Sequence, residues 1–284
     1  MTICRKFRFK RITWTLRRIA IKIPQSALVL EVGSGGNPYP RSNVLLDAYE
    51  ETRERHWDPL IHDRPTVLSF GENLPFRDKS FDYVIAAHVL EHTPYPEKFL
   101  AELQRVARAG YIETPDAFME RINPYKDHRL EVTVRDDGLV IRKKPAWICD
   151  ADLVELYEKR AKAIITSETI PQHADEFHMR FYWQDAIKYK VINPEIDATW
   201  VPPSASLAPP STQRGVKNKL RLLLLNLIRK QFSQSSRNAK LDILPLMRCP
   251  KCHSEDLARS SSKEIVCKSC GTQYIINRNI FQMH

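Results

Sequence analysis

Short apolar runs that alternate with a helical pattern constrain the fold of this chain most. Five runs have the length and β-rich composition of strands: residues 27–32, 44–47, 66–70, 81–86 and 110–113. Between the last two, a predicted helix over residues 96–109 begins at Pro96 and ends at Gly110, and one of its faces is apolar (Phe99, Leu100, Leu103, Val106 and Ala107). Continuous apolar strands interleaved with helices are typical of a parallel sheet covered on both faces. We therefore predict an α/β fold with a doubly wound, Rossmann-like and mostly parallel sheet.

The pattern changes after this sheet. Residues 130–144 predict a hairpin that turns at Asp136-Asp137-Gly138, because Asp-Gly supplies the positive φ of a tight turn. A helix over residues 150–163 and strands over 177–183 and 187–192 are expected next. Antiparallel strands are expected to finish the parallel sheet.

The formal charge of +10 is unevenly distributed along the chain. Residues 1–22 and 214–240 each carry eight Lys and Arg and no acid, and residues 241–284 add a net +2. The remaining residues, 23–213, therefore carry a net charge of −8. An acidic body with two basic appendages lacks the uniformly basic surface of a general nucleic-acid-binding protein, so nucleic acid is a less favoured partner.

A glycine-rich turn follows the first predicted strand. The turn reads Glu31-Val-Gly33-Ser-Gly35-Gly36, and the second strand ends in Asp47. Glycines at a strand end let the backbone approach a ligand, and an acid after the next strand can accept hydrogen bonds from ribose hydroxyls. A dinucleotide is disfavoured, because Pro38 stands where the third glycine of GxGxxG would be and the turn has no basic residue.

Residues 25–120 resemble class I S-adenosylmethionine-dependent methyltransferases, in the branch called methyltransferase type 11. The resemblance rests on LVLEVGSGG (28–36), GENLPFRDKSFDYVIAAHVLEH (71–92) and ELQRVARAGYIETP (102–115). It implies S-adenosyl-L-methionine as cofactor and a set of binding residues. Glu31, Gly33 and Gly35 would border its methionine part and ribose, Asp47 would bind the ribose hydroxyls, Gly71 and Glu72 would border the adenine, and Ala87 and His88 would lie beneath the sulfonium.

Two departures from this family accompany the resemblance. Phe70 stands where the family commonly has an acid, which favours stacking or backbone contacts for the adenine. The connection from Gly36 to Asn43 is short and contains Pro38 and Pro40, so the usual first helix is expected to be abbreviated at best.

Methyl transfer is an in-line displacement, to which a protein contributes mainly positioning and electrostatics. A base is needed only for a hydroxyl or a protonated amine. His88 and His92, after the fourth strand, are the candidate catalytic residues; the alternative is that both brace the loop. His128, His173 and His178 follow in the acceptor-facing half by their order along the chain.

Two CxxC pairs near the C-terminal end predict a metal site. Cys249-Pro-Lys-Cys252 and Cys267-Lys-Ser-Cys270 are fourteen residues apart and offer four thiolates to a tetrahedral Zn²⁺; the alternative is four unrelated cysteines. Four protein ligands leave no open position, so the zinc would be structural and His253 surplus. The tail resembles the small zinc-ribbon activators of tRNA, rRNA and release-factor methyltransferases. This resemblance implies a ribbon docked on the chain's own methyltransferase domain, with Arg278-Asn279 in place of the usual glycine.

The chain therefore divides into five predicted segments: a basic N-terminal helix (1–22), a methyltransferase domain (23–200), a Pro-rich linker (201–214), a basic amphipathic helix (215–240) and a zinc ribbon (241–284). The two basic helices either pack on the protein or contact an anionic membrane surface, with RNA contact as a third reading. No apolar run approaches the ~20 residues of a membrane span, and no secretory signal is visible. We expect a cytoplasmic protein, with peripheral contact at the inner membrane face as an option.

The predicted function is methylation by S-adenosylmethionine, with a sugar, a glycan or another small or lipid-linked acceptor methylated on oxygen. This acceptor class follows from a resemblance to bacterial enzymes associated with surface-glycan assembly, carried by the NPxP turn and the Gly-Tyr-Ile-Glu-Thr-Pro strand. One alternative is a methyltransferase for RNA or a translation protein, as the ribbon suggests. A second is a non-catalytic adaptor that keeps the methyltransferase fold.

Overall fold

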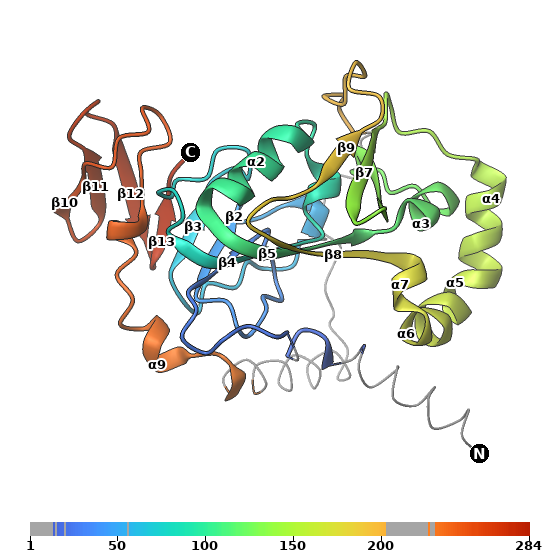
Figure 1. Ribbon diagram of the computed structural model, residues 1–284, viewed down its shortest axis with the longest axis horizontal. Helices are drawn as coiled ribbons and strands as arrows, with labels where there is room; N and C mark the ends of the chain where they lie inside the picture. The colour runs from blue at the N-terminus through green and yellow to red at the C-terminus, as the bar shows by residue number, and fades with distance from the viewer. Residues whose placement is uncertain (1–13, 15, 20, 56, 203–226, 228–230) are drawn as a thin grey trace. The chain divides into compact units, whose positions relative to one another are not determined.

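The computed structural model describes residues 14, 16–19, 21–55, 57–202, 227 and 231–284, which belong to two compact units (Figure 1). We call residues 23–86, 97–110 and 205–284 the sheet unit. Residues 1–22, 87–96 and 111–204 form the hairpin unit, named for its antiparallel pair of strands. Most of the predicted N-terminal helix, linker and second basic helix lies outside the described residues.

The sheet unit is built on parallel strands whose residues are almost all buried. They are β1 (Val29–Val32), β2 (Val44–Asp47), β3 (Thr66–Leu68), β4 (Phe81–Ala87) and the first residues of β5 (Ala107–Pro115). Their spatial order is β3-β2-β1-β4-β5, and the pairs β1–β2, β1–β4 and β2–β3 are parallel. Between β4 and β5 the chain forms helix α2 (Pro96–Val106), and a short turn of helix, η1 (Arg53–Arg55), follows β2. The predicted parallel sheet is confirmed.

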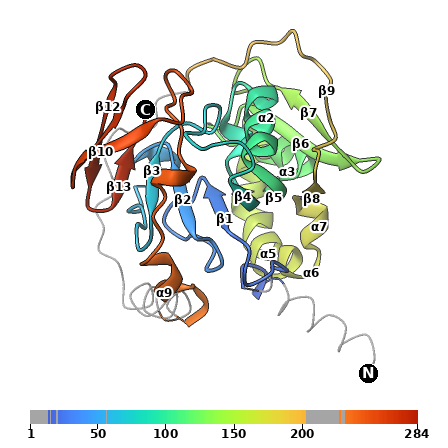
Figure 2. The ribbon, with the colours of Figure 1, turned by 60° about the vertical axis from the view of Figure 1, so that its left-hand side comes forward.

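The C-terminal segment extends the same sheet beyond β3. It comprises α9 (Ser235–Asn238), η5 (Leu244–Leu246), β10 (Leu257–Ser261), β11 (Glu264–Cys267), β12 (Gln273–Asn277) and β13 (Ile280–Gln282). Strands β10 to β13 are antiparallel neighbours, and β13 pairs in parallel with β3, with Phe281 opposite Val67 (Figure 2). The segment predicted as a zinc ribbon thus continues the parallel sheet by main-chain hydrogen bonds.

The hairpin unit contains a second, three-stranded sheet and a helical segment. Its elements are η2 (Leu90–His92), the end of β5, α3 (Ala117–Ile122), β6 (Leu130–Arg135), β7 (Gly138–Lys143), α4 (Ala151–Leu156), η3 (Tyr157–Ala161), α5 (Lys162–Ile164), η4 (Ile165–Thr169), α6 (Ile170–Gln172), α7 (Ala174–Phe177), β8 (His178–Gln184) and β9 (Tyr189–Val191). β6 and β7 are antiparallel, β9 pairs in parallel with β7, and β8 lies beside β5.

Several predicted boundaries are wrong, each for a local physical reason. The helix predicted to Ala109 ends at Val106, because Ala107 already begins β5 and its buried side chain belongs to the sheet. The turn between β6 and β7 uses positive φ at Asp136 and Asp137, whereas Gly138 starts β7. The antiparallel pair belongs to the separate three-stranded sheet.

The helix predicted over residues 150–163 begins as expected, because the Asp150 carboxylate caps the backbone N–H groups of Asp152 and Leu153 at 3.0 Å. It then runs on as consecutive α and π turns to Gln172. The predicted helix is therefore too short.

Two described residues bear on the basic segments. Leu16 and Leu227, which the sequence places on apolar helix faces, are both exposed. Within the hairpin unit, the Trp14 ring lies 4.9 Å from that of His178, and the Arg17 guanidinium lies over the Trp14 ring. Among the described residues, no helix combines the length and apolar character needed to cross a membrane.

Candidate functional site

The glycine-rich turn is fixed at the carboxyl end of β2. The backbone N–H groups of Gly33 and Ser34 donate to the Leu46 carbonyl at 2.8 and 3.1 Å. Gly33 and Gly35 adopt φ of 73° and 56°, a left-handed conformation that favours glycine. The hydroxyl of Ser34 is buried and has no hydrogen-bond partner among the residues that the structure describes. An orphaned hydroxyl inside a glycine turn is a polar group that a ligand could satisfy.

Asp47 ends β2 as predicted and lies against this turn. Its carboxylate accepts hydrogen bonds from the backbone N–H groups of Gly35 at 2.9 Å and Tyr49 at 3.3 Å, and from the Arg55 guanidinium at 3.1 Å. A carboxylate has about four acceptor sites, so these described contacts leave room for a ribose hydroxyl. Asp47 is thus held in a fixed orientation beside the turn.

Glu31 is held by contacts within the protein. Its carboxylate accepts from the Tyr39 N–H at 2.9 Å and from the Ser42 hydroxyl at 2.6 Å, and it is buried. These bonds fix the short connection between β1 and β2, in which the described residues form no helix. The expectation that the first helix is abbreviated is confirmed, and Glu31 is the residue that orders the connection.

The loop after β3 contains the residues expected around an adenine. Phe70 is exposed, and its ring meets those of Tyr49 and His284 edge-on, with centroids 5.9 Å away in each case. Gly71 is required by packing, because a Cβ there would lie 2.4 Å from the ring of Phe99 in α2. Glu72 is half-buried in the same loop.

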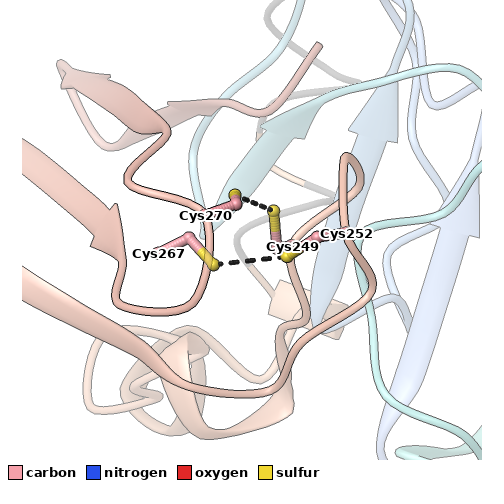
Figure 3. Close-up of side chains that lie close together, drawn as sticks. All are labelled: Cys249, Cys252, Cys267 and Cys270. Carbon is pink, nitrogen blue, oxygen red and sulfur yellow. Dashed lines mark hydrogen bonds between the residues drawn. The ribbon is translucent and has the colours of Figure 1, made fainter.

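The four cysteines converge as the two CxxC pairs predict (Figure 3). Sγ of Cys249 is 3.7 Å from that of Cys270, and Sγ of Cys252 is 3.5 Å from that of Cys267. Thiolates bound to one tetrahedral zinc at ~2.3 Å stand roughly 3.8 Å apart, so the arrangement fits Zn²⁺. The Tyr274 hydroxyl lies 3.0 Å from Cys249 Sγ, as an outer-shell hydrogen bond would.

The two cysteine loops have matching backbones. In each loop the carbonyl of the first cysteine accepts from the N–H four residues later, and its N–H donates to the carbonyl five residues later, at 2.8–2.9 Å. The partners are His253 and Ser254 for Cys249, and Gly271 and Thr272 for Cys267. His253 and Gly271 occupy the same place and both have positive φ, 60° and 73°. His253 therefore serves the turn, in agreement with its prediction as a surplus ligand.

In the hairpin unit, His88 is the centre of a group of charged side chains. His88 directly follows β4 and has a φ of 58°, an uncommon conformation for a residue with a side chain. Its Nε2 lies 3.1 Å from Glu113 of β5, and its Nδ1 lies 3.5 Å from Glu91. Glu113 also accepts from the Tyr111 hydroxyl and lies 3.8 Å from the Arg17 guanidinium.

These contacts shift the protonation of the group. Burial alone would lower the pKa of His88, but its hydrogen bonds and ion pairs with Glu113 and Glu91 raise that pKa to about 9. Burial would raise the pKa of Glu113, but His88, Tyr111 and Arg17 lower it to about 2. Burial and the nearby His88 charge lower the pKa of His178 to about 4. At neutral pH His88 is therefore an imidazolium, and a role as general base requires an alkaline medium.

His92 and His128 lie together in the same unit, with ring centroids 4.8 Å apart. Nδ1 of His92 donates to the Asp127 carbonyl at 3.2 Å, and Nδ1 of His128 lies 2.7 Å from the buried Glu120. His173 lies instead near Glu176, with Nδ1 3.6 Å from its carboxylate. Of the predicted histidines, His88 and His178 thus form one group, and His92 and His128 another.

A pocket of about 460 Å³ opens next to the end of β5 in the hairpin unit. Its lining combines exposed apolar side chains with charged ones: Asp116, Ala117, Phe118, Arg121, Ile122, Glu131, Thr133, Arg135, Val140, Arg142, Leu153 and Ile192. Arg121 pairs with Glu131 at 2.7 Å, and Thr133 donates to Asp116 at 2.6 Å. This size is in the range of small-molecule sites.

Comparison with known proteins identifies the central part of the chain. A family model described as "Methyltransferase domain" matches residues 39–112. Residues 39–112 are thus similar to this domain. Its sheet has the order and parallel pairing of the class I methyltransferase fold. The matched range includes Asp47, Gly71, Glu72, Ala87 and His88, whereas the glycine-rich turn precedes it.

Two curated relatives resemble part of this chain. An uncharacterized methyltransferase of Mycobacterium sp. (strain JLS) is 28% identical over 116 residues, which cover 39% of this chain and 46% of the relative. An uncharacterized protein of Methanocaldococcus jannaschii is 27% identical over 81 residues, 28% of this chain and 40% of the relative. The chain thus spans less than half the length of either relative.

Solved structures give weaker likenesses. A chain of the complex between the Haloferax volcanii Trm112 methyltransferase activator and a methyltransferase has a TM-score of 0.37 and 14% identity, and the match covers 64% of this chain and 94% of that one. A SAM-dependent methyltransferase of Thermotoga maritima has a TM-score of 0.30 and 19% identity, with 39% and 54% covered. Both scores are below 0.5, so the identification depends on the sequence match.

Sequence reasoning did not find several residues around these sites. Arg55 pairs with Asp47, Ser34 carries the orphaned hydroxyl, and Glu113 sets the charge of His88. Glu113 was visible in the matched Gly-Tyr-Ile-Glu-Thr-Pro strand and could have been considered as a partner for a histidine. Nothing in the sequence marks Arg55 or Trp14, since their contacts depend on loop geometry.

Proposed function

We propose that the protein transfers a methyl group from S-adenosylmethionine to a small acceptor. The observation that carries this proposal is the glycine-rich turn held against Asp47, with the buried Ser34 hydroxyl left without a protein partner. The methyltransferase domain match over residues 39–112 supports it independently. Glycines with positive φ and an acid after the neighbouring strand are what a nucleoside-like ligand requires.

The residues that the resemblance assigns to the cofactor are the ones that we propose to hold it. Gly33, Ser34 and Gly35 would border its methionine part, Asp47 would accept from its ribose, and Gly71 and Glu72 would border its adenine; Glu31 would position the turn. Ala87, which ends β4, and His88 are the residues that the resemblance implies beneath the sulfonium. When bound, S-adenosylmethionine supplies an activated methyl group, and the chain supplies orientation and charge.

The acceptor would bind in the pocket beside the end of β5. An apolar wall with the 55% exposed Phe118, together with Arg121, Glu131 and Thr133, suits a ligand with one apolar face and several hydroxyls. A sugar, a glycan or a lipid-linked glycan has this chemistry, so oxygen methylation of such an acceptor is our preferred reaction. Because His88 is protonated at neutral pH and both of its ring nitrogens face carboxylates, it would act through its charge, with Glu113 as its counter-charge, and would not accept a proton.

An RNA or translation-protein acceptor is the alternative, and the C-terminal ribbon is the feature that favours it. The ribbon contacts the sheet unit through β13, and the side chain of Arg77 donates to the Met247 and Glu255 carbonyls at 3.1 and 2.8 Å. A ribbon integrated in this way fits an activator module acting in cis. The four thiolates would hold one structural Zn²⁺, which supplies folding free energy and no reaction step.

A non-catalytic adaptor is the second alternative. The intact turn and the presence of Asp47 argue against it, since an adaptor has no need of either.

Contact with a membrane surface is a further part of the proposal that rests on sequence alone. The sixteen basic residues in segments 1–22 and 214–240 would attract anionic lipids by about 1 kcal/mol each near the headgroups. Sedimentation with acidic liposomes should then occur at low salt and be lost at ~1 M salt, where the Debye length falls to ~3 Å. If the protein does not sediment with the liposomes at low salt, the proposed membrane contact is wrong.

Calorimetry with S-adenosylmethionine and its demethylated product tests cofactor binding. We expect both to bind, and we expect Asp47→Ala to weaken both at least tenfold, because the ribose would lose a charged acceptor worth about 1.5–3 kcal/mol. Asp137→Asn, in the exposed turn between β6 and β7, is the matched control and should leave the affinity unchanged. Equal affinity of the wild type and the Asp47→Ala variant for the cofactor would show that Asp47 does not bind it.

A further inference from the structure

The hairpin unit contains a group of metal-ligating side chains that is separate from the four cysteines. Glu91 and His92 belong to η2, and His128 lies in the loop after α3. One ligand atom of each lies within 4.8 Å of the other two, and Glu91 and His128 are buried. We refer to these three residues as the Glu-His-His cluster.

Glu91 is the member whose surroundings require an explanation. Only 2% of the residue is exposed; among the described residues Oε2 has no hydrogen-bond partner, and Oε1 has only a long contact with His88 Nδ1, at 3.5 Å. A buried carboxylate with one long contact is costly, because little replaces the water that it has lost. A bound cation would satisfy both oxygens.

The two histidines are oriented as metal ligands usually are. The Asp127 carbonyl can only accept a hydrogen bond, so Nδ1 of His92 carries the proton and Nε2 has the lone pair. Nδ1 of His128 is likewise directed at Glu120 at 2.7 Å, and Lys144 fixes that carboxylate at 2.6 Å. Metal-bound histidines typically donate their second ring nitrogen to a carboxylate or a backbone carbonyl, which fixes the tautomer.

We propose that the Glu-His-His cluster binds one divalent transition-metal ion through the Glu91 carboxylate and the Nε2 atoms of His92 and His128. Two imidazoles and one carboxylate suit Zn²⁺, Mn²⁺ or Fe²⁺, whereas Ca²⁺ and Mg²⁺ prefer ligand sets made of oxygen. Ligand atoms around a tetrahedral ion at ~2.0–2.1 Å stand about 3.3 Å apart, so side-chain shifts of about 1 Å would close the site. Three protein ligands leave a position for water or a substrate oxygen. This site does not depend on the proposed methyl transfer.

A second group of potential ligands, His88, Glu113 and His178, is a poorer cation site. Glu113 already accepts from Tyr111, pairs with His88 and lies 3.8 Å from Arg17. A further cation beside Glu113 would be repelled by the Arg17 guanidinium. We therefore expect the Glu-His-His cluster to bind a metal ion in preference to this second group.

Titration with Mn²⁺, followed by the loss of the free-ion electron paramagnetic resonance signal, tests the proposal on the full chain that carries one equivalent of Zn²⁺, which the four soft thiolates bind first. Mn²⁺ prefers nitrogen and oxygen ligands and should leave the four thiolates to Zn²⁺. We expect one Mn²⁺ per chain in the wild type. Glu91→Gln and His128→Gln should each weaken Mn²⁺ binding more than tenfold. Glu120→Gln, which removes the charged outer-shell acceptor of His128, should weaken Mn²⁺ binding roughly 10–100-fold.

His173→Gln is the matched control, because His173 lies in the same unit outside the cluster, and it should bind Mn²⁺ like the wild type. Cys252→Ser should also leave Mn²⁺ binding unchanged, which separates this site from the cysteines. Circular dichroism checks the fold of each variant; if Glu91→Gln does not fold, His128→Gln and His92→Gln decide the question. The proposal is overturned if the wild type binds no Mn²⁺, or if the folded cluster variants bind it with wild-type affinity.

Discussion

At the residue scale, the group around His88 concentrates backbone strain and charge in one place. A left-handed φ of 58° is uncommon for a residue with a side chain, and here it directs the ring between Glu113 and Glu91. Both neighbours are buried carboxylates, so the imidazolium is favoured over the neutral ring. The residue that the sequence marks as a candidate catalyst is therefore a cation at neutral pH.

The pH dependence of stability should show this pairing. The pKa of His88 is raised from 6.5 to about 9, so its contribution to stability is fully present below about pH 6.5 and is lost as the pH rises through 9. The pKa of Glu113 is lowered from 4.5 to about 2, so its contribution is present above about pH 4.5 and is lost as the pH falls through 2. Urea unfolding without added divalent ions should show stability falling between pH 7 and 9.

Glu113→Gln removes the main counter-charge and serves as the comparison. The His88 ring, followed by nuclear magnetic resonance, should titrate at a lower pH in this variant than in the wild type. A His88 titration near 6.5 in the wild type would contradict the ion-pair account.

The sequence predicted those site residues whose role follows from their position relative to a strand. Gly33, Gly35 and Asp47 lie at strand ends, and the structure places the turn and Asp47 in contact. The sequence did not indicate that Gly71 fits against Phe99, and it missed Ser34. These roles depend on side chains that meet only after folding, which no local pattern encodes.

At the element scale, the parallel pairing of β13 with β3 joins the C-terminal segment, predicted to be a zinc ribbon, to the sheet. The hairpin between β12 and β13 turns at Arg278 and Asn279, whose φ angles of 48° and 67° provide the left-handed pair that a two-residue turn needs. The substitution of the usual glycine therefore does not disturb this turn. The sequence predicted that the ribbon docks, but not the strand it joins, because that partner lies about 200 residues away along the chain.

Phe281→Ala should measure the strength of this junction. Phe281 is 4% exposed and pairs with Val67, so we expect a loss of about 3–5 kcal/mol in the free energy of unfolding. Ile275→Ala, at a side chain that is 58% exposed in the adjacent strand, should cost less than about 0.5 kcal/mol. Similar losses in the two variants would show that β13 contributes little to the fold.

Cys267→Ser tests the metal site of the ribbon. Elemental analysis should find one zinc per chain in the wild type, and the variant should lose it and unfold the ribbon. Hydrogen exchange at the Thr66 amide, which donates to the Asn279 carbonyl at 3.4 Å, should then accelerate while the amides of β1 stay protected. Cys149→Ser, outside the cluster, is the control. A ribbon that remains folded without metal would contradict the zinc assignment.

Element boundaries were less predictable than element types. The helix α2 and the strands around it were expected, and Phe99, Leu100 and Leu103 are buried as the helical pattern indicates. The start of β5 at Ala107 was not expected, because Ala107 and Arg108 suit a helix as well as a strand. Pairing with the neighbouring strands decides which of these two structures they adopt. Propensity is a weak guide wherever tertiary contacts compete with it.

At the scale of the whole molecule, the chain contains a parallel sheet with a match to the methyltransferase domain, a C-terminal segment that extends this sheet, and a hairpin unit with two histidine groups. The net negative charge of residues 23–213 suits a cationic cofactor better than an RNA backbone. The basic segments carry the opposite charge and are the parts through which an anionic surface would be recognised.

The most direct test of the central claim is transfer of labelled methyl from S-adenosylmethionine. Purified protein, incubated with extracts from cells that lack it, should place the label in the glycan or lipid-linked sugar fraction, and Asp47→Ala should abolish the transfer. Label in RNA or protein instead would establish the alternative acceptor. Cofactor binding with no label in any fraction would contradict the assignment of this protein as a methyltransferase.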